Sequence, residues 1–163
     1  MKLDLERMLA KCENGHWSVD DFDWDRKSTL AMTQQEEMRI CQHFLNLSYI
    51  ERMAAALFLS LSNRMTDETV KAIYANFHRD EIRHSQAMAR LVDYFDVHHY
   101  RTYTPSRPML AFIPYFTGTL ETLNPSFANH AVTLGELFLD IALLRSIDDF
   151  VNDTITRFKA GQC

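Results

Sequence analysis

Glycine and proline are scarce in this chain, and their scarcity argues against several classes of protein. Only four of each occur among 163 residues, too few for a disordered or fibrous chain or for a fold of many short strands and turns. With 47% hydrophobic residues, the chain is long enough to bury a core of its own. We therefore expect one globular domain over residues 1–163, of the all-α class.

Cysteine pairs, basic charge and long apolar runs are also lacking. The spacings of Cys12, Cys41 and Cys163 match neither a disulfide framework nor a zinc motif, which indicates free thiols in a reducing compartment. The 17 basic and 22 acidic residues are dispersed, so no basic patch is present to bind a nucleic-acid backbone. The longest uninterrupted apolar run, 53–59, is far shorter than the roughly 20 residues that span a bilayer. We expect a cytoplasmic protein that binds neither nucleic acid nor membrane.

Capping signals and apolar periodicity predict three long helices. Thr33 and Glu36 form a capping box that opens the first helix. Thr66, followed by acids in the first turn, opens the second, and Asn124 followed by Pro125 opens the third. The short connection between the first two helices predicts an antiparallel pair. The predicted helices cover about 34–61, 67–94 and 125–155.

The segments outside the long helices are predicted to be mostly irregular. Residues 1–32 are polar after a short amphipathic stretch, and we expect Trp17 and Trp24 to pin this segment onto the bundle. Residues 96–124 contain three prolines and are predicted to form a crossover with one or two helical turns near 107–113. His98 and His99 in this crossover are adjacent and would point apart on a helix, so we interpret them as surface or packing residues.

Acidic and imidazole side chains occupy the predicted inward faces of the long helices. Glu81 and His84 fill a gap in the apolar series of the second helix at the same helical spacing. Glu51 and Glu136 interrupt the apolar series of the first and third helices in the same way, and Glu37 is a weaker candidate for the face of Glu51. Burying an unpaired carboxylate is costly, so each such acid is expected to be neutralised, ion-paired or bound to a cation.

A glutamate on one helix with Glu-x-x-His on the next resembles the ferritin-like di-iron carboxylate superfamily. That superfamily repeats this unit, so that four helices of an antiparallel bundle supply four Glu and two His. Residues 79–84 and 134–140 resemble its oxygen-activating members, including arylamine oxygenases, and the resemblance covers about residues 34–155. It implies that the metal ligands are Glu51, Glu81, His84 and Glu136, with Asp80 and Asp140 placed to hydrogen-bond a ligand or, for Asp140, to replace one.

The resemblance also implies a function. Two iron ions, with manganese as an alternative, would activate dioxygen to oxidise a small organic substrate. Two other functions remain open from the residues: an iron-handling ferritin-like protein, and a metal-free helical relative with a structural or interaction role, in which the inward acids pair with Arg or His.

The fourth ligand helix of the superfamily has no counterpart in the sequence. Repeating the 30 residues between Glu51 and Glu81 from Glu136 would place a second Glu-x-x-His near position 166, after Cys163. One chain therefore offers three Glu and one His. Three explanations are open: a shortened chain with an incomplete site, a homo-oligomer, most simply a dimer, in which each chain brings Glu51, Glu81 and His84, or substitute ligands among Asp140, Asp148 and Asp149.

Overall fold

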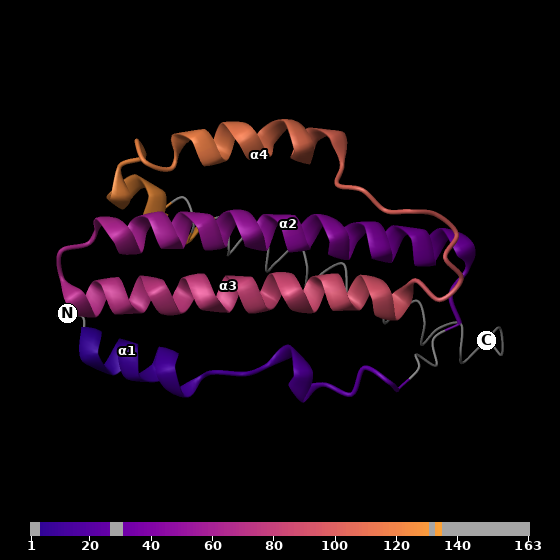
Figure 1. Cartoon of the computed structure of the whole chain (residues 1–163), viewed down its shortest axis with the longest axis horizontal. Coiled ribbons are helices and arrows are strands. Elements are labelled where there is room, and N and C mark those ends of the chain that lie inside the picture. Colours follow the sequence, from indigo (N-terminus) through magenta and orange to yellow (C-terminus); the bar gives the residue numbers. More distant parts are fainter. Residues whose placement is uncertain (1–3, 27–30, 131–132, 135–163) are drawn as a thin grey trace. The chain divides into compact units, whose positions relative to one another are not determined.

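Helices connected by turns and loops make up the described part of the chain, and no strand occurs in it. The computed structural model describes residues 4–26, 31–130 and 133–134. The prediction of an all-helical bundle is confirmed for these residues. The elements in chain order are α1 (Leu5–Asn14), the 3-10 turn η1 (Val19–Asp21), α2 (Gln34–Arg64), α3 (Glu68–Phe95) and α4 (Arg107–Thr119) (Figure 1).

The described residues fall into two compact units. The first holds 4–26 and 32–122, and the second holds Ala31 and the described residues from 123 onward. In the second unit residues 125–130 are helical, and the Asn124 side-chain oxygen accepts hydrogen bonds from the backbone N–H groups of Ser126 and Phe127. This confirms the predicted cap of the third helix, most of which lies outside the described residues. The expectation of one domain stays a prediction.

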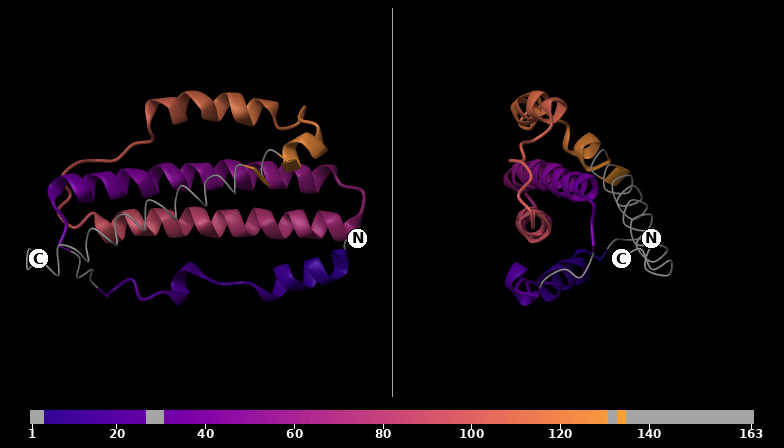
Figure 2. Two further views of the ribbon diagram at one scale, coloured as in Figure 1. Left: turned by 180° about the vertical axis from the view of Figure 1, so that it is seen from behind. Right: turned by 90° about the vertical axis from the view of Figure 1, so that its right-hand side faces the viewer.

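Helices α2 and α3 form the core of the first unit. They lie side by side and antiparallel, joined by a short turn (Figures 1 and 2). The predicted capping box opens α2, because Thr33 and Glu36 exchange side-chain to backbone hydrogen bonds. The N-cap of α3 is Asp67, one residue later than the predicted Thr66, because the Asp67 carboxylate accepts from two backbone N–H groups of the first turn.

Most of the buried apolar side chains belong to α2, and this bears on the question of a membrane. By length and composition α2 is also long and apolar enough to cross a bilayer. A helix buried in the core of a soluble protein meets the same criterion, so α2 does not decide between the two environments. The expected absence of a membrane partner stays a prediction. The buried apolar residues of α2 are Cys41, Phe44, Leu47, Ala55, Leu57, Phe58 and Leu61.

The N-terminal region packs along the side of α3 that faces away from α2 (Figure 1). Helix α1 extends further than the short amphipathic stretch read from the sequence. It is followed by residues 15–24, here called the N-terminal strap. Trp24 in the strap contacts Tyr94 edge to face, with ring centroids 6.2 Å apart. The guanidinium carbon of Arg90 lies 5.9 Å from the centroid of the Trp24 ring. The predicted packing of the strap tryptophans onto the bundle is thus confirmed for Trp24.

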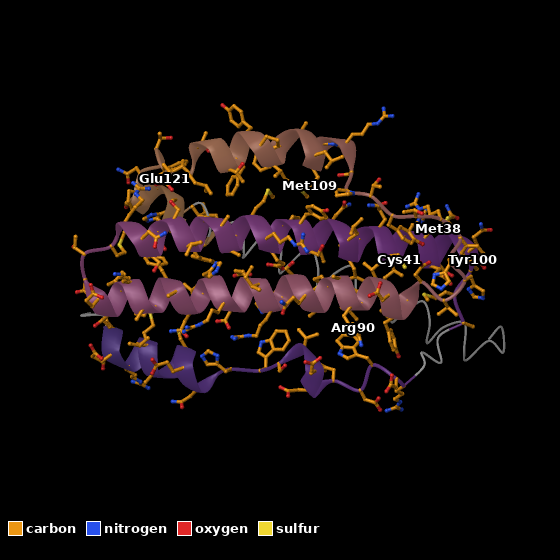
Figure 3. The ribbon with its side chains drawn as sticks, viewed as in Figure 1. Met38, Cys41, Arg90, Tyr100, Met109 and Glu121 are labelled. Atoms are coloured by element: carbon orange, nitrogen blue, oxygen red, sulfur yellow. The ribbon has the colours of Figure 1, made fainter. Side chains whose placement is uncertain are left out.

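The crossover leads from the end of α3 to α4, which lies along α2 on the side away from α3 (Figure 2). Helix α4 has 13 residues, longer than the one or two turns predicted. Pro108 stands in its first turn, where proline is tolerated, and Pro114 lies inside it. Met109 lies on the side of α4 that faces α2 (Figure 3).

Candidate metal centre

Three of the four predicted metal ligands meet between α2 and α3. Glu51 comes from α2, and Glu81 and His84 come from α3. One ligand atom of each residue lies within 4.8 Å of the ligand atoms of the other two. The arrangement follows from local geometry, because residues three apart share a helix face and the antiparallel turn brings the middle of α2 opposite the middle of α3.

Burial differs among the three ligands. Glu81 is 8% exposed, whereas Glu51 and His84 are half-buried. Nδ1 of His84 lies 3.1 Å from Oε2 of Glu81. The ring nitrogen that faces the site is therefore Nδ1, and in the metal-free protein it satisfies the buried carboxylate. A cation bound by both groups would replace this contact.

The residues on either side of the pair are held by polar contacts of their own. Asp80, expected to hydrogen-bond a metal ligand, forms an ion pair with Arg83 on its own helix. The Ser85 hydroxyl accepts a hydrogen bond at 3.1 Å from Nε of Arg52 on α2. The Arg52 contact ties α2 to α3 directly beside the three ligands. The role expected of Asp80 toward a ligand stays a prediction.

The remaining residues of the predicted site lie outside the described residues. These are Glu136 and Asp140, together with the substitute ligands Asp148 and Asp149. The described part of the chain therefore presents two carboxylates and one imidazole at this position.

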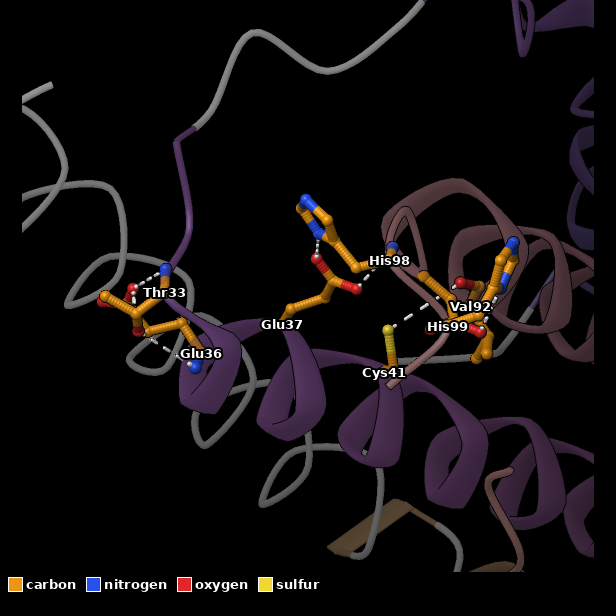
Figure 4. A network of polar contacts seen from close by, with 8 residues as sticks. Thr33, Glu36, Glu37, Cys41, Val92, His98 and His99 are labelled. Atoms are coloured by element: carbon orange, nitrogen blue, oxygen red, sulfur yellow. Dashed lines mark hydrogen bonds and ion pairs between the residues drawn. The ribbon is translucent and has the colours of Figure 1, made fainter. Parts of the chain in front are cut away.

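A second buried carboxylate, Glu37, proves to have a different role. It is 1% exposed, and its two oxygens face the backbone N–H and Nδ1 of His98, at 3.0 and 2.7 Å (Figure 4). Glu37 precedes Glu51 by 14 positions, about 21 Å along α2, so the two cannot share one metal. The apolar stripe of α2 gave the signal that Glu37 is buried. Its partner was missed because His98 comes from a loop distant in the sequence, although the His98 side chain is 57% exposed, as expected of a surface residue.

Cys41 lies near this end of the bundle and is fully buried. Its thiol contacts the Val92 carbonyl oxygen at 3.8 Å (Figure 4). Burial raises the pKa of the Cys41 thiol to about 11, against a smaller lowering by the Tyr103 hydroxyl. A thiol that stays protonated is a poor nucleophile and a poor metal ligand. Cys41 is thus a core residue, in agreement with the free thiol expected from the sequence.

A cleft of about 450 Å³ opens between the end of α3, the following loop and Leu45 of α2. Asp96, Arg101 and Tyr103 are among its lining residues, and none of the three candidate ligands is. The cleft is therefore separate from the metal group and gives it no substrate pocket.

Comparisons with known protein families, curated proteins and solved structures found no match. The interpretation of the three-residue group therefore depends on the chemistry and geometry of its own side chains.

Proposed function

We propose that this protein is a ferritin-like di-iron carboxylate protein that activates dioxygen to oxidise a small organic substrate. The observation that supports the proposal is the meeting of Glu51, Glu81 and His84 within 4.8 Å on two antiparallel helices. The expected homodimer and cytoplasmic location belong to the same proposal.

The donor set suits iron or manganese. Carboxylate oxygen favours hard cations, and imidazole is a common ligand of iron. Two donors on opposite sides of one ion, each about 2.1 Å from it, lie roughly 4.2 Å apart. A group whose ligand atoms span at most 4.8 Å would close onto an ion by small side-chain rotations. The charge of the ion would also compensate the buried carboxylate of Glu81, which is otherwise costly.

The side chains have distinct roles in this proposal. The two carboxylates supply negative charge to the cation, and His84 binds through Nδ1 once that nitrogen has lost its proton. Metal binding is therefore expected to release protons and to weaken as the pH falls. On α2 the buried Leu47 and Ala55 lie one turn before and one turn after Glu51 and limit the access of water from that side. When bound, iron supplies the redox chemistry with dioxygen that side chains lack.

A second metal ion needs more donors than the three described residues. Glu136 is the predicted further carboxylate in the same chain. In a homodimer, two copies of Glu51, Glu81 and His84 would give four Glu and two His, the full set of the superfamily.

The contact between His84 and Glu81 favours one other function, that of a metal-free helical protein. At 3.1 Å it already satisfies the buried carboxylate within the chain. In that case the three residues are a structural ion-pair group, and their replacement changes stability without loss of any cofactor.

An anaerobic Fe(II) titration with sizing of the protein tests the proposal. We expect at least one iron per chain for the wild type, and little for Glu81→Gln. Glu37→Gln is the matched control. It changes the other buried glutamate described in helices α2 and α3 and leaves Glu51, Glu81 and His84 intact. Binding of only a small fraction of an iron or manganese per chain would overturn the proposal. Iron oxidation in a large closed assembly, without turnover of any organic substrate, would replace it with iron handling.

A further inference from the structure

Trp17 in the N-terminal strap stacks on the imidazole of His84. The ring centroids are 5.8 Å apart and the planes are inclined by 26°. We propose that Trp17 is a positioning residue, which holds the His84 ring with Nδ1 toward Glu81 and thereby raises the affinity of the metal group. This inference rests on the proposed metal-binding function.

A histidine ring on a half-buried helix face needs such a restraint. Its terminal torsion is broad, so the ring turns easily unless its surroundings fix it. The His84 side chain is 43% exposed, and its contact with Glu81 lies at one edge of the ring. Stacking against Trp17 restrains the face of the ring. Both contacts favour the orientation in which Nδ1 is presented to Glu81, and residues that orient a metal-binding imidazole tune metal affinity in other metal centres, where they act through hydrogen bonds.

The strap itself is fixed to α3 around this contact. His16, the residue before Trp17, lies with Nδ1 3.2 Å from a guanidinium nitrogen of Arg83, the residue before His84. On the other side, the Phe22 ring meets the Trp17 ring edge to face at 5.8 Å. Trp17 is thus held through its neighbour His16 and through the Phe22 ring, so its position over His84 does not depend on one weak contact.

Trp24 offers a matched control within the same strap. It packs on Tyr94 and Arg90 and also contacts Phe22 in the strap, and Tyr94 is ten residues, about 15 Å, further along α3 than His84. Replacing Trp24 removes an indole from the strap and a neighbour of Phe22, and it removes no ring that stacks on His84. Any effect common to both tryptophans is therefore a general loss of packing.

The first measurement uses the metal-free protein. The ring resonances of His84 are recorded by NMR in the wild type, Trp17→Leu, Trp17→Phe and Trp24→Leu, after thermal denaturation has shown that each variant folds. We expect Trp17→Leu to move the His84 resonances, because the ring current of the indole is lost, and Trp24→Leu to leave them in place. Trp17→Phe keeps a flat aromatic face and tests the same contact in a variant that retains more of the packing.

The second measurement is the affinity for Co(II), a spectroscopic probe for the same donors, with Fe(II) measured alongside. We expect binding about 10- to 100-fold weaker in Trp17→Leu, and within about 3-fold of the wild type in Trp24→Leu and Trp17→Phe. Unmoved His84 resonances together with equal affinity in the two leucine variants would overturn the positioning role. Failure of the wild type itself to bind either metal would instead refute the proposed function, while the NMR comparison would still show whether Trp17 lies against the His84 ring.

Discussion

Glu81→Gln and Glu37→Gln make a pair of substitutions whose effects on stability should differ sharply. Each removes one charge from a buried carboxylate and nearly keeps its volume. The surroundings differ, because Glu81 lies within 4.8 Å of the donor atoms of Glu51, whereas both oxygens of Glu37 accept from His98. The two variants therefore separate a site built to hold a cation from a glutamate that holds a loop.

The magnitudes follow from these contacts. Two ionised carboxylates 4.8 Å apart, the largest separation within the group, repel by about 3.5 kcal/mol at an effective dielectric constant of about 20 and by about 1 kcal/mol in bulk water, and the half-exposed position of Glu51 places this pair toward the lower figure. Glu81→Gln relieves this repulsion and also weakens the contact with His84, by about 1 kcal/mol. We expect the two changes nearly to cancel, so that the free energy of unfolding of the metal-free protein changes by less than about 1 kcal/mol.

Glu37→Gln relieves no comparable repulsion between carboxylates. A glutamine has one acceptor oxygen, for the backbone N–H of His98, so its neutral amide group replaces the carboxylate oxygen that meets Nδ1 and the charge of that contact is lost. We expect a loss of about 2–3 kcal/mol, which corresponds to a fall in melting temperature of roughly 4–12 °C for a chain of this size.

Thermal unfolding with and without Fe(II) checks both expectations. At a metal concentration of about 100 times Kd, the wild type and Glu37→Gln should gain about 2.7 kcal/mol, and Glu81→Gln should gain almost nothing. The reasoning is refuted if Glu81→Gln destabilises the metal-free protein more than Glu37→Gln does and no metal-dependent gain occurs in the wild type. That result would identify the group as a structural ion pair.

Three further expectations concern the fold. Leu61→Ala should cost about 2–5 kcal/mol in chemical denaturation, because Leu61 is fully buried, whereas Leu59→Ala, at a residue 44% exposed, should cost much less; equal losses would contradict the assigned core. The raised pKa of Cys41 means that the folded protein holds the thiol proton more tightly than the unfolded chain, so the free energy of unfolding should fall as the pH rises from about 9 to about 11. A Cys41→Ala variant with an equally steep fall would show that other groups cause it. Thr33→Ala should cost about 1 kcal/mol through loss of the α2 cap, and an unchanged denaturation midpoint would show that the cap is dispensable.

The ends of the two core helices could be read from the sequence to within a few residues. Helix starts are set by local chemistry, in which a side chain bonds the free N–H groups of the first turn, and Thr33 and Asp67 do so here. The length of α4 was underestimated because Pro114 was taken as a break. The helix contains this proline and continues past it to Thr119, although none of its residues is buried, so a proline alone did not mark the end of the helix.

The sequence by itself determined that Glu51, Glu81 and His84 would lie on the inward faces of the first two long helices, because helical periodicity fixes the direction of each side chain from its position alone. The spacing of Glu81 and His84 was therefore sufficient to predict that they share a face. Only the tertiary structure decided which of these groups meet. It brings Glu51 to that pair, pairs Glu37 with His98 and places Trp17 over the His84 ring. Contacts between segments that are distant in the sequence depend on how helices and loops pack, and a local sequence pattern does not specify that packing.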